Sequence, residues 1–347
     1  MTSLLIIKIF ALATISCLVA LALTPLLNRV LSHYKLGKKI RQKETPLYFN
    51  LHRHKAGTPT MGGIVIWGTT LILAVLLALL AKISGNPIFD HLNFLNRQET
   101  LLPLGALVTA AMVGLVDDFL SLLGFGGHQY GVKFRYKIFL YILIALWGAL
   151  WFYYKLDWDI IHLPFDGDLR LGWLFIPFFV LVTVGTSFAV NETDGLDGLA
   201  GGVLLTNFAA FGAIAFAAQK YDLAALCAVI AGALIAFLWF NVPPAKFFMG
   251  DTGSMSLGTA LAIIAVYLKA SLVLPVIGVV LVAEAGSVII QLWSKKFRGK
   301  KVFLSSPLHH HLEAKGWSES KIVMRFWMIS MIASMIGLIL ILMDRTL

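Results

Sequence analysis

Carboxylates stand beside long apolar runs at three places in the sequence. Residues 190–202 read VNETDGLDGLAGG and carry three acids, GLVDDF at 114–119 carries two adjacent aspartates, and FFMGDTGS at 247–254 carries Asp251. Ionisable groups this deep in apolar sequence are costly unless they bind something. An aspartate beside the backbone amides of a helix N-terminus suits phosphate and Mg²⁺, so the segment around Asp251 predicts a phosphate–magnesium site with exposed amides. A simple helix N-cap is the alternative.

The spacing of the other acids limits what each can contact. Asp117 and Asp118 end an apolar run, and neighbours on a helix point about 100° apart, so we expect them to serve different partners. Acids at a helix C-terminus oppose the macrodipole, which favours function over a solvated helix end. Asp194 and Asp197 share one face if their segment is helical, and a capped turn is the alternative. The spacing there does not fit a calcium loop.

Histidine and lysine residues near these acids are further candidates. Three consecutive histidines, His309 to His311, cannot all converge on one ion from a regular helix, so a zinc site is not expected. We expect one or two of them to contact phosphate or sugar, with a helix start as a role for the third. Lys55 precedes GTPTMGG at 57–63, and Lys246 is close enough in sequence to Asp251 to pair with it.

The composition is that of a membrane protein. Of 347 residues, 59% are hydrophobic and only 13% are charged, and the mean hydropathy is +0.84. Apolar runs of about 17–25 residues, enough to cross roughly 30 Å of hydrocarbon, recur along the chain. They are continuous rather than alternating, which predicts an all-α polytopic protein and not a β-barrel. Cys17 and Cys227 lie inside such runs, which argues against a disulfide framework or a thiolate metal site.

Ten membrane-spanning helices are predicted in one catalytic domain covering residues 1–347. Their ranges are 4–31, 61–82, 101–116, 137–154, 173–190, 199–218, 222–240, 253–268, 272–293 and 323–343. The first run is too long for a signal-peptide core, so we expect it to be retained. Eighteen Lys and Arg residues fall in the odd-numbered connections, against about seven in the even connections and tails. The positive-inside rule therefore puts the odd connections in the cytoplasm and both termini outside.

The polar motifs all fall in odd connections, which predicts a site facing the cytosol. A transporter would instead place acids near the middle of spans and show inverted repeats, so that class is disfavoured. The formal charge of +10 follows the same distribution and indicates membrane topology rather than a nucleic-acid partner.

The order of the motifs is more specific than any one of them. AGTPTMGG, GLVDDF, NETDGLDGLAGG, NVPPAKFFMGDTGS and PLHHH together resemble the polyprenyl-phosphate N-acetylhexosamine-1-phosphate transferase superfamily. The PLHHH form is most similar to the phospho-N-acetylmuramoyl-pentapeptide transferases within it, and the resemblance covers essentially the whole chain. It implies transfer of the phospho-sugar from UDP-N-acetylmuramoyl-pentapeptide to undecaprenyl phosphate, giving lipid I and UMP, with Mg²⁺ as cofactor. It also implies a bacterial inner-membrane location and a possible homodimer; a related transferase using UDP-N-acetylglucosamine is the alternative.

The resemblance assigns roles to motif positions. It implies catalytic roles for Asp117, Asp118, Asp251 and His310, with Asp251 and Asp117 as metal ligands. The implied substrate-binding residues are Lys55, Thr60, Lys133, Asn191, Asp194, Gly195, Leu196, Asp197, Asn241, Phe248, Gln291 and His311. Phe248 matches an aromatic that can stack on uracil, and the 191–197 segment matches the loop that holds the nucleoside.

The chemistry leaves two routes, and the chain departs from the family at three positions. An acceptor phosphate monoester has its second pKa near 6, so direct attack on the donor is favoured, with Asp117 positioning or deprotonating the acceptor. A covalent phospho-aspartate intermediate is the alternative. The family usually has an aliphatic residue at Glu192, Asn at Phe188 and Lys at Ser121. We expect Lys133 or Lys137 to compensate for the lysine missing at 121.

Overall fold

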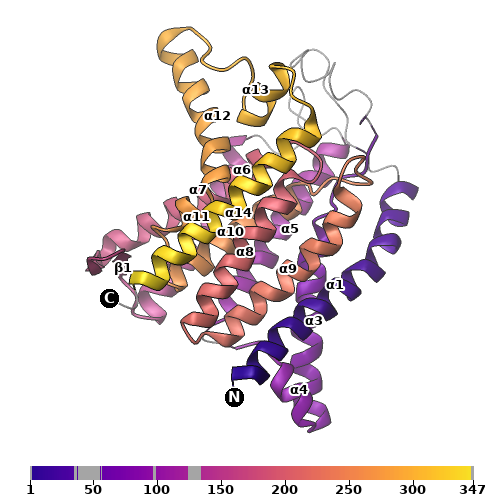
Figure 1. Ribbon diagram of the computed structural model, residues 1–347, viewed down its shortest axis with the longest axis vertical. Helices are drawn as coiled ribbons and strands as arrows, with labels where there is room; N and C mark the ends of the chain where they lie inside the picture. Colours follow the sequence, from indigo (N-terminus) through magenta and orange to yellow (C-terminus); the bar gives the residue numbers. More distant parts are fainter. Residues whose placement is uncertain are drawn as a thin grey trace.

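The structure, a computed structural model, describes residues 2–34, 37, 55, 57–96, 99–123 and 134–344 (Figure 1). The α-helices are α1 (Thr2–His33), α3 (Ile64–Ser84), α4 (Pro87–Leu92), α5 (Leu101–Leu123), α6 (Phe134–Leu150), α7 (Phe175–Thr193), α8 (Leu199–Ala217), α9 (Tyr221–Asn241), α10 (Asp251–Tyr267), α11 (Leu274–Ile277), α12 (Val279–Arg298), α13 (Leu308–Ala314) and α14 (Glu319–Asp344). The other elements are a π-helical turn η2 (Trp151–Lys155), a 3₁₀ turn η3 (Gly172–Leu174), and an antiparallel hairpin of β1 (Ile160–Leu163) and β2 (Gly167–Arg170). Lys133, a predicted substrate-binding residue, lies outside the described residues.

Eight helices within these ranges are long and apolar enough to cross a membrane. They correspond to the first seven and the last of the ten predicted spans, which confirms an all-α, multi-pass membrane protein. The eighth predicted span is α10, which has 17 residues. The ninth is divided at Gly278 into the short α11 and the longer α12, whose last turn carries three basic residues.

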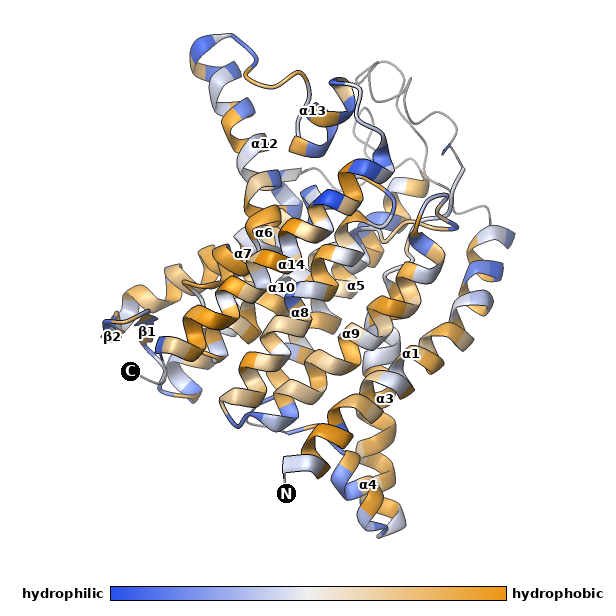
Figure 2. Ribbon diagram, viewed as in Figure 1, coloured by the Kyte–Doolittle hydropathy of each residue, from blue (hydrophilic) through white to orange (hydrophobic). Residues whose placement is uncertain are grey.

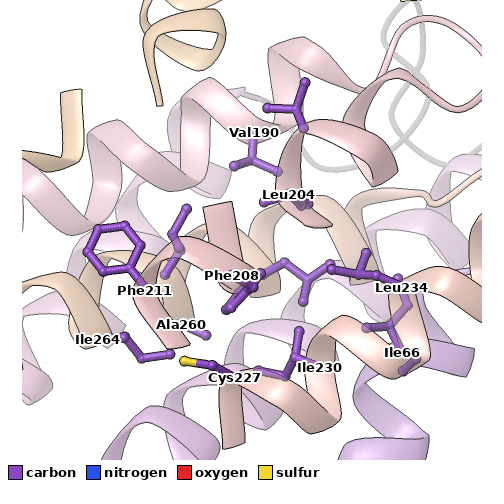
Figure 3. Close-up of a cluster of buried hydrophobic side chains, with 14 of the residues drawn as sticks. Ile66, Val190, Leu204, Phe208, Phe211, Cys227, Ile230, Leu234, Ala260 and Ile264 are labelled. Carbon is purple, nitrogen blue, oxygen red and sulfur yellow. The ribbon is translucent and has the colours of Figure 1, made fainter. Parts of the chain in front are cut away.

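The centre of the bundle is α10. Every residue from Thr252 to Val266 is buried, which is typical of a helix enclosed by other helices rather than facing lipid. Its most extensive contacts are with α5 and α7, while α8 packs against α9 and α9 against α1. Figure 3 shows side chains from α3, α7, α8, α9 and α10 meeting around Phe208. Cys227 belongs to this core, where it packs as a small buried residue, and like Cys17 it is free.

Polar residues gather toward the two ends of the bundle, and mostly apolar residues lie between them (Figure 2). Both termini lie toward one end, where the hairpin is tied to the end of α14 (Figure 1). There, His162 lies between Asp168, at 2.7 Å, and Asp344, at 2.6 Å. At the other end α12 projects beyond the other helices, with α13 beside it (Figure 1).

Two helices continue past their predicted ends at the edge of the site. The spacing predicts that the third span stops at 116, but α5 runs to Leu123 and therefore contains Asp117 and Asp118. The fifth span is predicted to end at 190, but α7 continues to Thr193. Both extensions pack against α10, whose contacts stabilise helical turns that the polar sequence alone does not favour.

Candidate active site

Asp251 is the first residue of α10, so this helix begins two residues before the predicted start of the eighth span at 253. Gly250 before it has φ 73°, a conformation that residues with a Cβ rarely adopt. A Cβ at Gly250 would also lie 2.6 Å from Oδ2 of Asp118 and 2.8 Å from Oγ1 of Thr60. Glycine therefore makes the turn that presents Asp251 to α5.

Asp118 holds this turn in place from α5. Its Oδ1 accepts the backbone N–H of Asp251, and its Oδ2 accepts the backbone N–H of Thr252, each at 3.1 Å. A carboxylate here satisfies amides that have no partner inside the helix and complements the macrodipole. The expectation that these amides are exposed to a phosphate is wrong, because Asp118 occupies them. Asp118 is only 8% exposed and acts through Asp251.

Asp117, Asp251 and Lys137 form one charged group, called the Asp–Lys centre below. Nζ of Lys137, in the first turn of α6, lies 2.6 Å from Oδ2 of Asp117 and also contacts Oδ2 of Asp251. The two carboxyl groups are within hydrogen-bonding reach of each other. Asn191, near the end of α7, donates from Nδ2 to Oδ1 of Asp251 at 2.7 Å. Four helices thus converge on one cation between two acids. The prediction that Asp117 and Asp118 serve different partners is confirmed.

Lys137 is a candidate site residue that the sequence indicates only weakly, since it enters only as an alternative to Lys133. The available signal is a lysine at the start of an apolar span, which needs an acid partner. The predicted pairing of Lys246 with Asp251 is wrong. Nζ of Lys246 lies 5.2 Å from the ring centroid of Phe240, and Lys137 occupies the position beside Asp251.

A second ionic group joins the segment before α3 to the start of α14. Nζ of Lys55 lies 2.7 Å from Oδ1 of Asp197 and 2.5 Å from Oε1 of Glu319. Burial lowers the pKa of Lys55, but the hydrogen bonds to Asp197 and Glu319 outweigh burial and raise the pKa above its usual value. Glu319 is absent from the sequence predictions, because an acid in the first turn of a helix reads as an ordinary helix-start residue.

Asp197 fastens the turn at 194–198 to two neighbouring segments. Its backbone N–H donates to Oε1 of Glu319 at 2.8 Å, and its Oδ2 accepts the backbone N–H of Ala245 at 3.0 Å. Asp197 is 3% exposed, whereas Asp194 is half-buried. The shared helical face proposed for the two acids is wrong, since α7 ends at Thr193 and the alternative, a turn, is what forms.

Asn241 and Leu196 hold the same turn in place through hydrogen bonds and core packing. Oδ1 of Asn241 accepts the backbone N–H of Gly198 at 2.9 Å, and its Nδ2 donates to the backbone oxygen of Phe247 at 2.8 Å. Leu196 is 4% exposed and belongs to the main hydrophobic core. Both residues thus position the turn, leaving Asp194 and Gly195 as its half-buried members.

Thr60 and Phe248 lie where the 59–63 segment runs beside the loop before α10. The backbone N–H of Phe248 donates to the oxygen of Pro59, and the N–H of Gly62 donates to the oxygen of Phe248, each at 2.8 Å. This pairing fixes Phe248, whose side chain is half-buried, so one part of it can meet a planar ligand. Thr60 is 7% exposed and lies against the Gly250 turn.

The three consecutive histidines have three separate partners. The Nδ1 contacts are Glu284 Oε2 for His309 at 2.9 Å, Glu313 Oε2 for His310 at 2.7 Å, and the backbone N–H of Leu304 for His311 at 3.1 Å. In the ranges that the structure describes, no group of three or more His, Cys, Asp or Glu side chains is placed to hold a metal ion. Partial burial and the charge of Lys315 lower the pKa of His311.

Gln291 on α12 clamps the loop before these histidines. Its Oε1 accepts the backbone N–H groups of Val302, at 2.9 Å, and Phe303, at 3.0 Å. Its Nε2 donates to the backbone oxygen of Phe303 at 2.9 Å, and the residue is 2% exposed. The structure therefore gives Gln291 a supporting role beside the site rather than a free face for a ligand.

Similarity to known proteins identifies the family of this chain. A profile of glycosyl transferase family 4 matches residues 100–269, and a phospho-N-acetylmuramoyl-pentapeptide-transferase signature matches residues 55–66. A phospho-N-acetylmuramoyl-pentapeptide-transferase of Chloroflexus aurantiacus is 41% identical over 323 residues, which cover 89% of this chain and 83% of that protein. One from Bacillus thuringiensis is 38% identical over 327 residues, covering 94% of this chain and 95% of that protein. The chain belongs to the phospho-N-acetylmuramoyl-pentapeptide transferase family.

The two segments that match this transferase family meet in the candidate site. The signature begins at Lys55 and includes Thr60, while the glycosyl transferase match runs from the start of α5 to the end of α10. The second segment contains the Asp–Lys centre. It also contains Asp197, which forms an ion pair with Lys55 of the signature. His310, His311 and Gln291 lie outside both matches, on α12 and α13.

Proposed function

We propose that this chain transfers phospho-N-acetylmuramoyl-pentapeptide from its UDP-activated donor to undecaprenyl phosphate, giving lipid I and UMP in peptidoglycan synthesis. Membership in the transferase family supports the reaction. Phosphoryl transfer requires mainly alignment and neutralisation of charge, which suits a preorganised charged group. The observation that carries the proposal is the Asp–Lys centre at the end of an apolar groove, because one reactant is soluble and the other has a lipid tail.

We propose Mg²⁺ as the cofactor, held by Asp251 and Asp117. Two carboxylates within hydrogen-bonding reach of each other repel unless a cation or a proton lies between them, so the pair fits a cation site. Mg²⁺ commonly takes only one or two protein carboxylates and completes its shell with phosphate oxygens and water. When bound, the ion would neutralise charge on the donor diphosphate.

The protein groups each have a defined part in the proposed transfer. Lys137 offers a positive charge to the transferred phosphoryl group, and Asp118 fixes Asp251 through the first amides of α10. Asp117 positions or deprotonates the acceptor phosphate, which attacks the β-phosphorus of the donor while UMP leaves. A covalent phospho-aspartate on Asp117 is the other route, and isolation of such an adduct would replace direct attack.

Two apolar grooves on the outside of the bundle support a lipid-borne acceptor. One, between α5 and α6, includes a hollow of about 290 Å³ that is lined by Asp117 and Lys137 as well as apolar side chains. The other, between α7 and α12, has a volume of about 510 Å³ and is lined from Leu181 to Ala189 on α7. The first groove offers an isoprenoid chain a path from lipid to the Asp–Lys centre, and the second offers another apolar place for the chain beside α7.

We also propose ten spans in one domain, both termini outside, and an active site facing the cytoplasm across the bacterial inner membrane. The excess of Lys and Arg in the odd connections supports this orientation, as does the position of Lys295, Lys296 and Arg298 at the end of α12. Fusion of a reporter to the α12–α13 connection and to the 160–170 hairpin tests the sidedness. The homodimer implied by the family resemblance is tested by measuring the mass of the detergent-solubilised protein.

The decisive experiment is transfer of radiolabelled phospho-sugar to undecaprenyl phosphate, with and without Mg²⁺. We expect transfer from UDP-N-acetylmuramoyl-pentapeptide to require Mg²⁺ and to be lost in Asp251→Asn. The matched control is Asp166→Asn, an exposed aspartate in the hairpin at the opposite end, which should behave as wild type. Transfer from UDP-N-acetylglucosamine instead would establish the alternative donor, and full activity of Asp251→Asn would reject the site.

A further inference from the structure

Glu284 and His309 form a fully buried pair that the proposed transfer does not use. Both side chains are 0% exposed, Glu284 on α12 and His309 on α13. Oε2 of Glu284 lies 2.9 Å from Nδ1 of His309. The backbone N–H of His309 points to the same carboxylate, 3.2 Å from Oε1 and 3.4 Å from Oε2. A buried carboxylate is stable only if such donors surround it, so the pair is a specific joint between two helices.

The contacts of Glu284 fix where the imidazole of His309 carries its proton. A carboxylate accepts hydrogen bonds, so Nδ1 at 2.9 Å must carry a hydrogen. Nε2 is buried and has no hydrogen-bond partner among the described residues. A proton on Nε2 would therefore be a buried donor without an acceptor, which costs about 1–3 kcal/mol. The arrangement favours the neutral tautomer with Nδ1–H toward Glu284 and a lone pair on Nε2.

The lone pair of Nε2 faces the backbone of Gly195, in the turn between α7 and α8. A Cβ built at Gly195 would lie 2.1 Å from Nε2 and 2.6 Å from Cε1 of His309. The glycine hydrogen on that side therefore points at Nε2, and a C–H hydrogen next to an unprotonated nitrogen is a weakly favourable contact. A protonated nitrogen or a larger residue at 195 would push the turn and the ring apart.

We propose that Glu284 is a positioning residue for the sugar-nucleotide donor. By fixing the tautomer of His309, it seats the ring against Gly195 and sets the distance between the 194–198 turn and the α13 histidines. Asp194 stands on one side of this contact and His310 on the other, with the His309 and His310 rings 4.1 Å apart between centroids. The inference rests on the proposed function, since it assigns the donor to this part of the site.

The other charged groups near the joint do not provide the same restraint. Glu192 lies close enough to feel the charges of His309 and Glu284, but it is half-buried at the end of α7. Glu313 is paired with His310 through Nδ1 at 2.7 Å, one turn farther along α13. Glu284 alone among these three contacts both the ring and the backbone N–H of His309.

The first test compares Glu284→Gln and Glu284→Ala in the intact protein. Glutamine keeps one oxygen for Nδ1–H, whereas alanine leaves two buried donors unsatisfied. We expect the KM for UDP-N-acetylmuramoyl-pentapeptide to rise about tenfold in Glu284→Ala and less in Glu284→Gln, while the KM for undecaprenyl phosphate stays unchanged. Glu99→Gln, which removes a carboxylate beside Lys220 at the far end, is the control and should leave both constants unchanged.

The second test separates a contact between Gly195 and His309 from a direct contact between Gly195 and the donor. Gly195→Ala should raise the donor KM in the wild-type background and have no further effect in His309→Ala, because removing the ring makes room for the methyl group. An equal effect in both backgrounds would overturn the proposal, as would Glu284 variants with an unchanged donor KM. If the wild-type protein itself fails to use this donor, the proposed function fails, and calorimetric titration with UDP still reports whether Glu284 affects nucleotide binding.

Discussion

Oδ1 of Asp118 accepts the backbone N–H of Asp251 at 3.1 Å, so one aspartate on α5 sets the position of the aspartate that begins α10. Its neighbour Asp117 faces Lys137 instead, with Oδ2 and Nζ 2.6 Å apart. Two adjacent aspartates therefore have different partners. Asp118 accepts hydrogen bonds from the backbone at the start of a buried helix, and Asp117 forms an ion pair in the Asp–Lys centre.

Substituting the two acids should separate stability from activity. Asp118→Asn keeps one oxygen but turns an amide NH₂ toward a backbone N–H, so we expect a loss of about 1–3 kcal/mol in unfolding free energy together with lost transfer. Asp117→Asn should lose transfer with a much smaller change in stability. Thermal unfolding in detergent and the transfer assay measure the two effects. Equal destabilisation by both substitutions would contradict the separate roles.

Removing the ammonium group of Lys137 should reduce turnover and change the response to metal. In Lys137→Met the two carboxylates lose the cation between them, so we expect kcat to fall by about 100-fold and half-saturation to occur at lower Mg²⁺ concentration. Lys220→Met, at the opposite end, removes a lysine of the same length and should leave both values unchanged. A weaker response to Mg²⁺ in Lys137→Met would argue that the lysine and the metal do not share the centre.

The sequence predicts the fold class and most of the site, and the failures have a common physical origin. Apolar runs and motif order suffice to place Asp117, Asp194 and Asp251 near the ends of long apolar helices, because these are local properties of the chain. Lys137 is indicated only as an alternative to Lys133, and Glu319 is missed, because their partners lie far away in sequence, 114 residues from Lys137 to Asp251 and 264 from Lys55 to Glu319.

The same reason explains the residues whose roles changed. Gln291, Asn241 and Asp118 read as polar groups available to substrate, and in the fold their polar atoms bind neighbouring backbone. A buried side chain that satisfies a loop and one that binds a ligand have the same residue types and the same spacing. They are distinguished only by whether their polar atoms already have hydrogen-bond partners in the folded protein.

The ion pairs of Lys55 should stabilise the protein equally across the neutral range. The pKa of Lys55 is raised in the folded protein, so its contribution is fully present below the unfolded value of about 10.4 and is lost only as pH rises through the folded pKa. Glu319→Gln should therefore lower the melting temperature by the same amount at pH 6 and pH 9. A difference that appears only below pH 7 would point to a group other than Lys55. Lys321→Gln, an exposed change beside the same helix start, serves as the control.

Matched glycine substitutions can identify the groove that holds the acceptor chain. An added Cβ meets nothing within 4 Å at Gly185, in the α7–α12 groove, or at Gly105, in the α5–α6 groove. Leucine at either position should therefore fill the groove without disturbing the bundle. We expect the substitution in the occupied groove to raise the KM for undecaprenyl phosphate several-fold while the donor KM stays constant. If neither variant changes the acceptor KM, the tail binds elsewhere.

The hairpin at the opposite end should come loose from α14 as pH rises. Burial lowers the pKa of His162, but the hydrogen bonds that its ring donates to Asp168 and Asp344 outweigh burial, and the pKa lies above its usual value of about 6.5. Both carboxylates stabilise the protonated form of His162. The ion pairs of this imidazole with Asp168 and Asp344 are therefore fully present below about pH 6.5 and are lost as pH rises through the raised pKa. Two contacts remain at high pH: Lys269 pairs with Asp168 and holds the hairpin to the end of α10, and the backbone N–H of Phe165 donates to Oδ1 of Asp344 at 2.6 Å. We expect proteolysis at the 164–167 turn to accelerate between pH 6 and pH 9 in the wild type and to be fast and pH-independent in His162→Gln. His91→Gln, at the same end of the bundle, should retain the wild-type profile; a flat wild-type profile would show that the imidazole charge does not hold the hairpin.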